Sequence, residues 1–181
     1  VQRNKGRLDS ISPVVSALDH PDLTYSKYTT TLELGDNFDL TVLGILDEEE
    51  WENHLPRNNG KTHLVTFHGS VRGYVSDTGW VSDRGDIDIS FLENWDYGLL
   101  GDIHEPQAAD KNDKFLWAGS LCQNNHGEKN NKGFLVWDIE DTDSYKVRHV
   151  HIPNPKPFMT LHLTDKGNLP RKVQVPEGAR L

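Results

Sequence analysis

The sequence predicts a mixed α/β or α+β fold that is rich in strands and carries two or three helices. Most apolar segments are short and alternate with polar positions, which is the pattern of half-buried strands. Hydrophobic residues make up 35% and charged residues 26% of the 181 positions, a composition that supports one packed domain. Runs of strands with few helical segments favour an α/β or α+β sandwich over a helical bundle.

In the first third of the chain the pattern predicts a helix, two strands joined by a turn, and a second helix. The expected elements are a helix at 12–18, strands at 29–34 and 38–46, and a short acidic helix from Asp47 to Trp51. Ser12 and Pro13 suit the N-cap and first position of the first helix. Gly35-Asp36-Asn37 is a turn signal between the two strands. Asp47 is expected to cap the second helix, whose first-turn glutamates suit the helix dipole.

The rest of the chain predicts strands separated by polar, glycine-rich loops. The expected strands lie at 62–67, 97–100, 115–121, 133–139, 145–152 and 158–163. The stretch 71–85 has no clear period and is expected to be an irregular excursion. Pro153, Pro155 and Pro157 form a stiff connector, so we expect a domain edge near 154–157.

Cysteine content and charge limit the classes of function. The single cysteine, Cys122, excludes a disulfide framework; it is expected to be a buried inert thiol in a reducing, cytoplasmic compartment. No apolar run reaches the roughly 18 residues that span a membrane, and the first residues lack a signal-peptide pattern. The net charge is −9, yet residues 146–181 carry seven basic and two acidic side chains. This basic tail either meets phosphates or is a solvated strand face.

Candidate metal ligands stand where two predicted strands end. His68-Gly69 follows one strand, and Gly101-Asp102-Ile103-His104 follows another. Sites form where parallel strands end, and glycine lets a ligand approach the backbone. On a pleated strand Asp102 and His104 would point the same way. Imidazole and carboxylate together suit manganese, iron or zinc.

Each of these residues also has a structural interpretation. His68 can be a hydrogen-bonded core histidine, Asp102 a turn residue and His104 a surface group. A serine-hydrolase reading through Ser70, His68 and Asp77 lacks the nucleophile-elbow motif and is disfavoured. The tryptophans can stack on bases but are more often core aromatics; they are Trp80, Trp95, Trp117 and Trp137.

The order of several motifs resembles the SbcD-like DNA exonuclease subunits of the calcineurin-like metallophosphoesterase superfamily. The matching motifs are His68-Gly69-Ser70-Val71 with Gly73, Asp77-Thr78-Gly79, Gly101-Asp102-Ile103-His104, Ala118-Gly119-Ser120, Gly127-Glu128 and Lys132-Gly133-Phe134. They cover about residues 60–140 in the family's order. Asn4 to Ile11 resembles the helix entry that follows the third metal motif in phage-type members. Asp102 departs from the histidine usual at its position.

The resemblance implies a partial metallophosphoesterase domain at 1–154, a β-sandwich flanked by helices. A connector and the start of a DNA-binding cap would follow at 155–181. The family's first three metal motifs would lie before Val1. His68 and Asp102 would bind one divalent ion and His104 a second. Manganese is expected for both ions, with magnesium, iron and zinc as alternatives. Asn125, His126 and Glu128 are weaker candidates for contacts with substrate.

The implied function is manganese-dependent hydrolysis of DNA phosphodiesters in repair or recombination. Such a nuclease would act in a bacterial or phage-infected cell, as a homodimer with an SbcC-like coiled-coil ATPase subunit. Three ligands do not complete a two-metal site, so the chain alone is expected to be inactive or weak. The alternatives are a phosphatase for small phosphoesters and a catalytically inactive interaction module.

Overall fold

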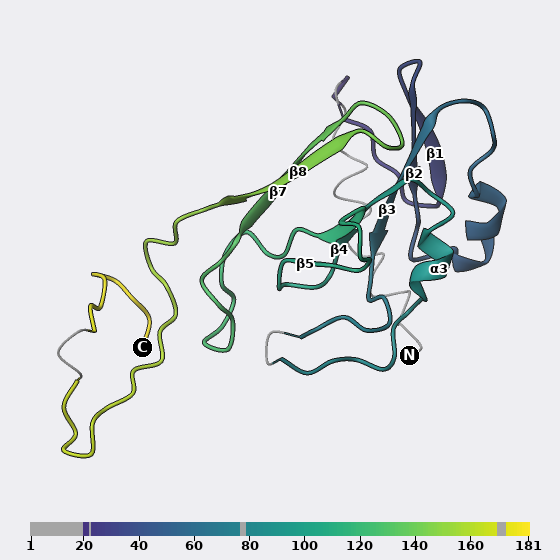
Figure 1. Cartoon of the computed structure of the whole chain (residues 1–181). Helices are drawn as coiled ribbons and strands as arrows, with labels where there is room; N and C mark the ends of the chain where they lie inside the picture. The colour runs from purple at the N-terminus through teal and green to yellow at the C-terminus, as the bar shows by residue number, and fades with distance from the viewer. Residues whose placement is uncertain (1–19, 22, 77–78, 170–172) are drawn as a thin grey trace.

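The computed structural model describes residues 20–21, 23–76, 79–169 and 173–181. In these residues the chain folds as a mixed α+β structure made mostly of strands (Figure 1). The expected strand-rich α+β class is therefore confirmed, whereas the metallophosphoesterase sandwich stays a prediction. The helix predicted at 12–18 lies outside the described residues. Within the described part, no helix combines the length and apolar composition needed to cross a lipid bilayer.

The main sheet has six strands in the order β1-β2-β3-β4-β6-β5. They are β1 (Thr30–Leu34), β2 (Phe38–Val42), β3 (Thr62–His68), β4 (Tyr97–Gly101), β5 (Gln107–Ala108) and β6 (Phe115–Trp117). The central strands β2, β3, β4 and β6 are mutually parallel, while β1 and β5 pair antiparallel at the edges. Parallel strands end at the same edge of a sheet, so the ends of β3 and β4 lie side by side.

One face of the main sheet carries the hydrophobic core. Two helical segments cover this face: η1 (Glu48–His54), a 3-10 helix, and α3 (Ile89–Leu92), a single α-helical turn. Trp51 of η1 meets Phe67 of β3 edge-on, with 5.6 Å between ring centroids, and lies 5.9 Å from Phe91. The buried members of this core include Val65, Phe67, Leu92, Trp95, Leu100, Phe115 and Trp117.

A separate antiparallel hairpin packs against the opposite face. It consists of β7 (Gly133–Ile139) and β8 (Tyr145–His151). Tyr97 of β4 is fully buried beneath it, and its ring centroid lies 6.2 Å from Trp137 and 5.0 Å from Tyr145. Burial raises the pKa of Tyr97 to about 12. The hairpin therefore forms a second, smaller layer over the main sheet.

Three predicted strands differ from those observed. The strand expected at 38–46 ends at Val42, because the chain turns and the Gly44 amide donates to the Thr29 hydroxyl at 2.9 Å. The strand expected at 115–121 ends at Trp117, since Gly119 has a φ of +77°. No strand forms at 158–163, where Phe158 makes a single bridge to Arg180.

Two side-chain expectations are also wrong. Cys122 was expected to be buried, but it lies exposed in a loop that follows the early end of β6. Asp47 makes no side-chain capping bond to η1. Its carboxylate instead accepts hydrogen bonds from the amide and the hydroxyl of Thr29, at 2.8 and 2.9 Å. Asp47 thus fastens the chain just before β1 rather than starting the helix.

Candidate metal centre

The candidate centre begins with a histidine and an aspartate at the ends of neighbouring parallel strands. His68 is the last residue of β3 and stands in register with Gly101, the last residue of β4. Asp102 follows directly, and its Oδ1 lies 3.9 Å from His68 Nδ1. The two side chains are 68% and 43% exposed, so both are open to solvent. The structure therefore brings together two of the three predicted ligands.

A buried indole holds these two strand ends together. The Nε1 of Trp117 donates to the carbonyl oxygens of Gly69 and Gly101, at 3.2 and 3.1 Å. The Gly69 amide also donates to the Gly101 oxygen at 3.2 Å. Trp117 is 1% exposed and packs in the core. The spacing of His68 and Asp102 is thus set by a rigid part of the molecule.

Strand alternation, the basis of the sequence prediction, does not explain why His104 and Asp102 lie together. The strand ends at Gly101, so strand alternation does not align the two side chains. Asp102 has a φ of +89°, which turns the backbone sharply at this position. Both side chains still line one shallow pocket of about 170 Å³, which they share with Tyr74.

The imidazole of His104 is held from behind by a buried carboxylate. His104 Nδ1 lies 3.1 Å from Oε1 of Glu128, whose side chain is fully buried, while His104 is 47% exposed. This contact favours the tautomer with its proton on Nδ1, which leaves Nε2 as an acceptor. Metal-binding histidines usually donate one ring N–H to a carboxylate and bind the metal ion through the other ring nitrogen.

Glu128 is itself fixed by a buried ion pair. Its Oε2 lies 3.1 Å from Nζ of Lys132, which is also fully buried, and accepts a hydrogen bond from the Asn124 amide at 3.1 Å. Lys132 Nζ donates to the His104 carbonyl oxygen at 2.8 Å. Burial alone would raise the pKa of Glu128, but hydrogen bonds from His104, Asn124 and Lys132 outweigh burial and lower it. Glu128 therefore stays anionic and anchors His104.

The residues predicted to contact substrate occupy three different environments. Asn125 is exposed, and its Nδ2 donates to Glu128 Oε1 at 3.2 Å. The exposed His126 packs edge-on against Phe158, with 4.8 Å between ring centroids. Glu128 lies behind His104 and faces away from solvent. Contact of Asn125 and His126 with a substrate stays a prediction, whereas the position of Glu128 fits a residue that orients a ligand.

Partly buried Tyr74, which lines the same pocket, contacts an exposed tryptophan. Trp80 is 56% exposed and meets Tyr74 edge-on, with 6.4 Å between ring centroids. The Gln107 side chain holds this loop by bonding both the amide and the carbonyl of Val75, at 2.8 and 2.7 Å. Trp95 and Trp117 are buried, which confirms that they are core aromatics. The exposed indole of Trp80 is therefore accessible to a planar group such as a base.

The structure does not support the hypothesis of a serine hydrolase built on Ser70 and His68. The Ser70 hydroxyl donates to Asp86 Oδ2 at 3.0 Å. The Ser70 amide donates to the same oxygen at 2.9 Å, so Asp86 fixes the turn after β3. Asp77 lies outside the described residues.

The donor chemistry fits divalent ions, although the described residues do not gather a full ligand set. Among them no group of three or more histidine, cysteine, aspartate or glutamate side chains is placed to hold one ion. His68 and Asp102 form a pair, and His104 stands beside it with its own carboxylate support. An imidazole with a carboxylate suits manganese, iron or zinc.

Comparison with known proteins gives a distant viral relative and no matching family model. No family model matches the sequence. The chain is 27% identical over 187 residues to the uncharacterized protein R555 of Acanthamoeba polyphaga mimivirus. The alignment covers 95% of this chain and 14% of the viral protein, so the chain spans about one seventh of the length of that relative.

Proposed function

We propose that this chain is the distal part of a two-metal phosphoesterase of the SbcD-like DNA nuclease type, acting within a longer protein. The observation that carries the proposal is the His68–Asp102 pair at the ends of β3 and β4, with a contact of 3.9 Å. His104, locked by buried Glu128, stands next to it. The motif order along residues 60–140 supports the same assignment.

In this proposal His68 and Asp102 hold one divalent ion and His104 holds a second. Manganese is the first candidate, and magnesium, iron and zinc follow. Divalent ions there supply Lewis-acid activation of a phosphodiester. The remaining ligands would come from residues before Val1, as the resemblance implies.

DNA is a better substrate candidate than a small phosphoester because of the aromatic pair beside the pocket. Trp80 is exposed and Tyr74 lines the pocket together with Asp102 and His104. Stacking of one base on such a ring contributes about 1–3 kcal/mol and tolerates any base. The proposal also includes a homodimer that works with an SbcC-like ATPase subunit. This part rests only on the family resemblance.

Manganese binding tests the site directly and does not require turnover. Mn²⁺ added to the 181-residue chain is expected to broaden the imidazole NMR signals of His68 and His104 before those of His149 and His151. Asp102→Asn should lower the affinity for Mn²⁺ about tenfold or more, because the carboxylate ligand of the same ion is lost. The same broadening would then require a correspondingly higher Mn²⁺ concentration. Asp36→Asn, in the exposed β1–β2 turn, is the matched control. Equal broadening in both variants would count against the site.

Turnover separates the nuclease from its two alternatives. With the protein that contains the upstream motifs, we expect manganese-dependent cleavage of linear duplex DNA and little hydrolysis of nitrophenyl phosphate. The reverse preference would identify a small-molecule phosphatase. Absence of both activities, together with absence of Mn²⁺ binding, would identify a non-catalytic interaction module. Rapid cleavage by the 181-residue chain alone would contradict the partial-site proposal.

A further inference from the structure

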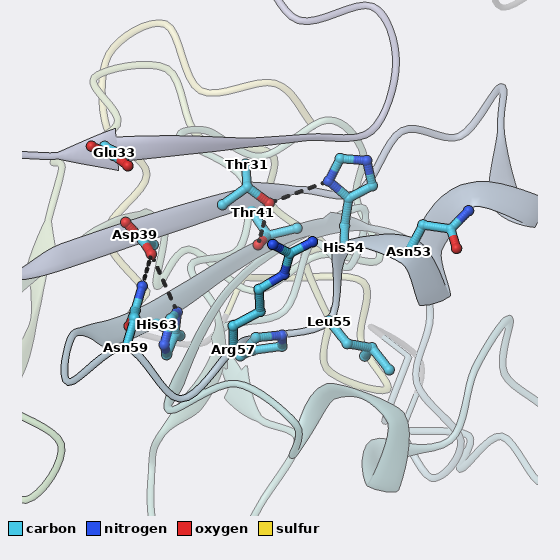
Figure 2. Close-up of a pocket in the computed structure, with 11 residues that line it drawn as sticks. Thr31, Glu33, Asp39, Thr41, Asn53, His54, Leu55, Arg57, Asn59 and His63 are labelled. Atoms are coloured by element: carbon cyan, nitrogen blue, oxygen red, sulfur yellow. Dashed lines mark hydrogen bonds and ion pairs between the residues drawn. The ribbon is translucent and has the colours of Figure 1, made fainter.

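A second polar pocket lies at the end of β2 and β3 opposite to the candidate metal centre. Asp39 and His63 are paired in the parallel register near the start of these strands. His68 lies at the far end of β3, roughly 17 Å away at the rise of a strand. The pocket has a volume of about 380 Å³ (Figure 2). We call it the basal pocket; the lining residues used below are Thr31, Asp39, Thr41, His54, Arg57 and His63.

One half of the basal pocket contains a carboxylate that is already neutralised. Asp39 accepts hydrogen bonds from Lys61 Nζ at 3.0 Å and from Asn59 Nδ2 at 2.9 Å. Lys61 also lies 3.7 Å from Glu33 Oε2, but this second carboxylate is 82% exposed and stands in solvent. Burial alone would raise the pKa of Asp39, but these hydrogen bonds outweigh burial and lower it. Lys61 therefore offsets the charge of Asp39, the buried carboxylate of this half, and leaves the negative charge of Glu33 to solvent.

The other half of the basal pocket presents a guanidinium. Figure 2 shows Arg57 reaching toward Thr41 and His54, away from Asp39. Among the described residues, no carboxylate forms an ion pair with Arg57. A planar guanidinium offers its donors in a fork that matches two oxygens of a phosphate.

A chain of hydrogen bonds links the His54 imidazole to the core. The Trp95 indole can only donate, so Thr41 Oγ1 accepts from it at 3.0 Å. Thr41 Oγ1 lies 3.3 Å from Thr31 Oγ1, which lies 3.3 Å from His54 Nδ1. In the His54 tautomer whose Nδ1 accepts from Thr31, the ring proton is on Nε2, and His54 then offers an N–H donor in addition to those of Arg57.

We propose that the basal pocket binds the phosphate group of a small phosphorylated ligand of nucleoside monophosphate size through Arg57 and His54. A volume of about 380 Å³ lies within the range of small-molecule sites. Asp39 and His63, in the other half, face the hydroxyl groups of the same ligand. The proposal is independent of the metal centre, since it uses none of the metal-ligand candidates.

The test is a titration of the 181-residue chain with inorganic phosphate and, separately, with adenosine monophosphate. We expect saturable binding of both in calorimetry, with NMR shifts at the imidazole of His54 and none at His68. Arg57→Gln should weaken both affinities about tenfold or more, because charge-assisted hydrogen bonds to the phosphate are lost. Arg57 is exposed, so the variant is expected to fold, as circular dichroism will show.

Arg148→Gln on β8 is the matched control, because it removes the same charge from an exposed position outside the basal pocket. This variant should bind both probes as the unmodified chain does. An equal loss of affinity in Arg148→Gln and Arg57→Gln would reveal general ion attraction and overturn the proposal. Failure of either probe to saturate would overturn it as well.

Discussion

Glu128 is the side chain on which the orientation of His104 depends. It lies behind the imidazole, is fully buried, and shares its carboxylate between His104, the Asn124 amide and Lys132. A buried ion pair of this kind contributes little net stability compared with apolar residues, but loss of one partner leaves a charge without compensation. The pair therefore couples the stability of the loop to the geometry of a candidate ligand.

Replacing Glu128 with glutamine should expose this coupling. Glu128→Gln preserves shape and leaves the buried Lys132 without its counter-ion, so we expect a loss of about 3 kcal/mol in the free energy of unfolding. Urea denaturation measures it. Arg72→Gln, which breaks the exposed 3.0 Å pair with Asp88, is the control and should change less than about 1 kcal/mol. Similar small losses in both variants would show that the buried pair is unimportant.

The titration of Glu128 predicts a loss of stability in acid. Its folded pKa is lowered from the ordinary value of 4.5, so its contribution is fully present above pH 4.5. This contribution disappears as the pH falls through the lowered folded value. Unfolding measured between pH 7 and pH 3 should show a steeper acid decline for the unmodified chain than for Glu128→Gln. Parallel curves would contradict the assignment.

At the residue scale, the sequence identifies the candidate ligands, but it does not predict which residues hold them in place. His68, Asp102 and His104 are recognisable because they follow strand-like segments and stand beside glycines. The supporting role of Glu128 is not recognisable, because it depends on a loop that returns to His104 from outside the strands. The four-residue spacing of Glu128 and Lys132 is a signal, but that spacing is equally common on exposed surfaces.

The ends of β3 and β4 act as one unit because Trp117 joins them. Its indole donates to the carbonyl oxygens of Gly69 and Gly101 from within the core. The separation of His68 and Asp102 is therefore fixed by a residue of a third strand, β6. An aromatic ring without the N–H would fill the same space without this link.

Trp117→Phe is expected to loosen the strand ends while the sheet remains folded. Loss of a donor to two buried carbonyl groups should lower the free energy of unfolding by about 1–3 kcal/mol, with part of that from the smaller ring. Hydrogen exchange should accelerate at the amides of Gly69 and Asp102 more than at Val65. Uniform acceleration along β3 would show instead that the whole sheet depends on the ring.

At the element scale, strand positions are predictable and strand ends are not. Alternation places β3, β4, β7 and β8 correctly, because side chains on a pleated strand face opposite environments. The early ends of β2 and β6 depend on Gly44 and Gly119, whose backbones approach Thr29 and His104. α3 is a single turn, too short to show helical periodicity.

On the scale of the whole molecule, the C-terminal segment is held by the loop after β6 and by contacts within the segment itself. Gln123 exchanges hydrogen bonds with the backbone of Phe158, at 3.1 and 3.3 Å. The Arg180 guanidinium stacks 3.6 Å from the centroid of the Phe158 ring and bonds the Lys156 carbonyl at 2.9 Å. In Figure 1 this segment extends away from the sheets and returns on itself.

Removing the segment should leave the main sheet intact. A chain that ends at Asn154 is expected to keep its free energy of unfolding within about 1 kcal/mol, because few buried contacts are lost. Hydrogen exchange should rise only around Gln123 and Glu128. Unfolding of β3 and β4 in this variant would contradict the domain edge that the prolines near 154–157 predict.

The basal pocket shows what the sequence does not predict at this scale. Asp39 and His63 belong to different segments and become neighbours only through the parallel register of β2 and β3. Arg57 comes from the loop after η1, which no periodic pattern places. The fold class follows from alternation alone, whereas this pocket depends on strand pairing.

The positive φ of Asp102 predicts that the stability of this turn and the proposed metal site make opposite demands on one residue. A side chain in that conformation is strained by about 1–2 kcal/mol relative to glycine. Asp102→Gly is therefore expected to raise the melting temperature while it removes the carboxylate beside His68. A melting temperature that rises by a few degrees, together with loss of Mn²⁺ binding, would show that this aspartate lowers the stability of the fold. A lower melting temperature would show that Asp102 is not strained in this turn.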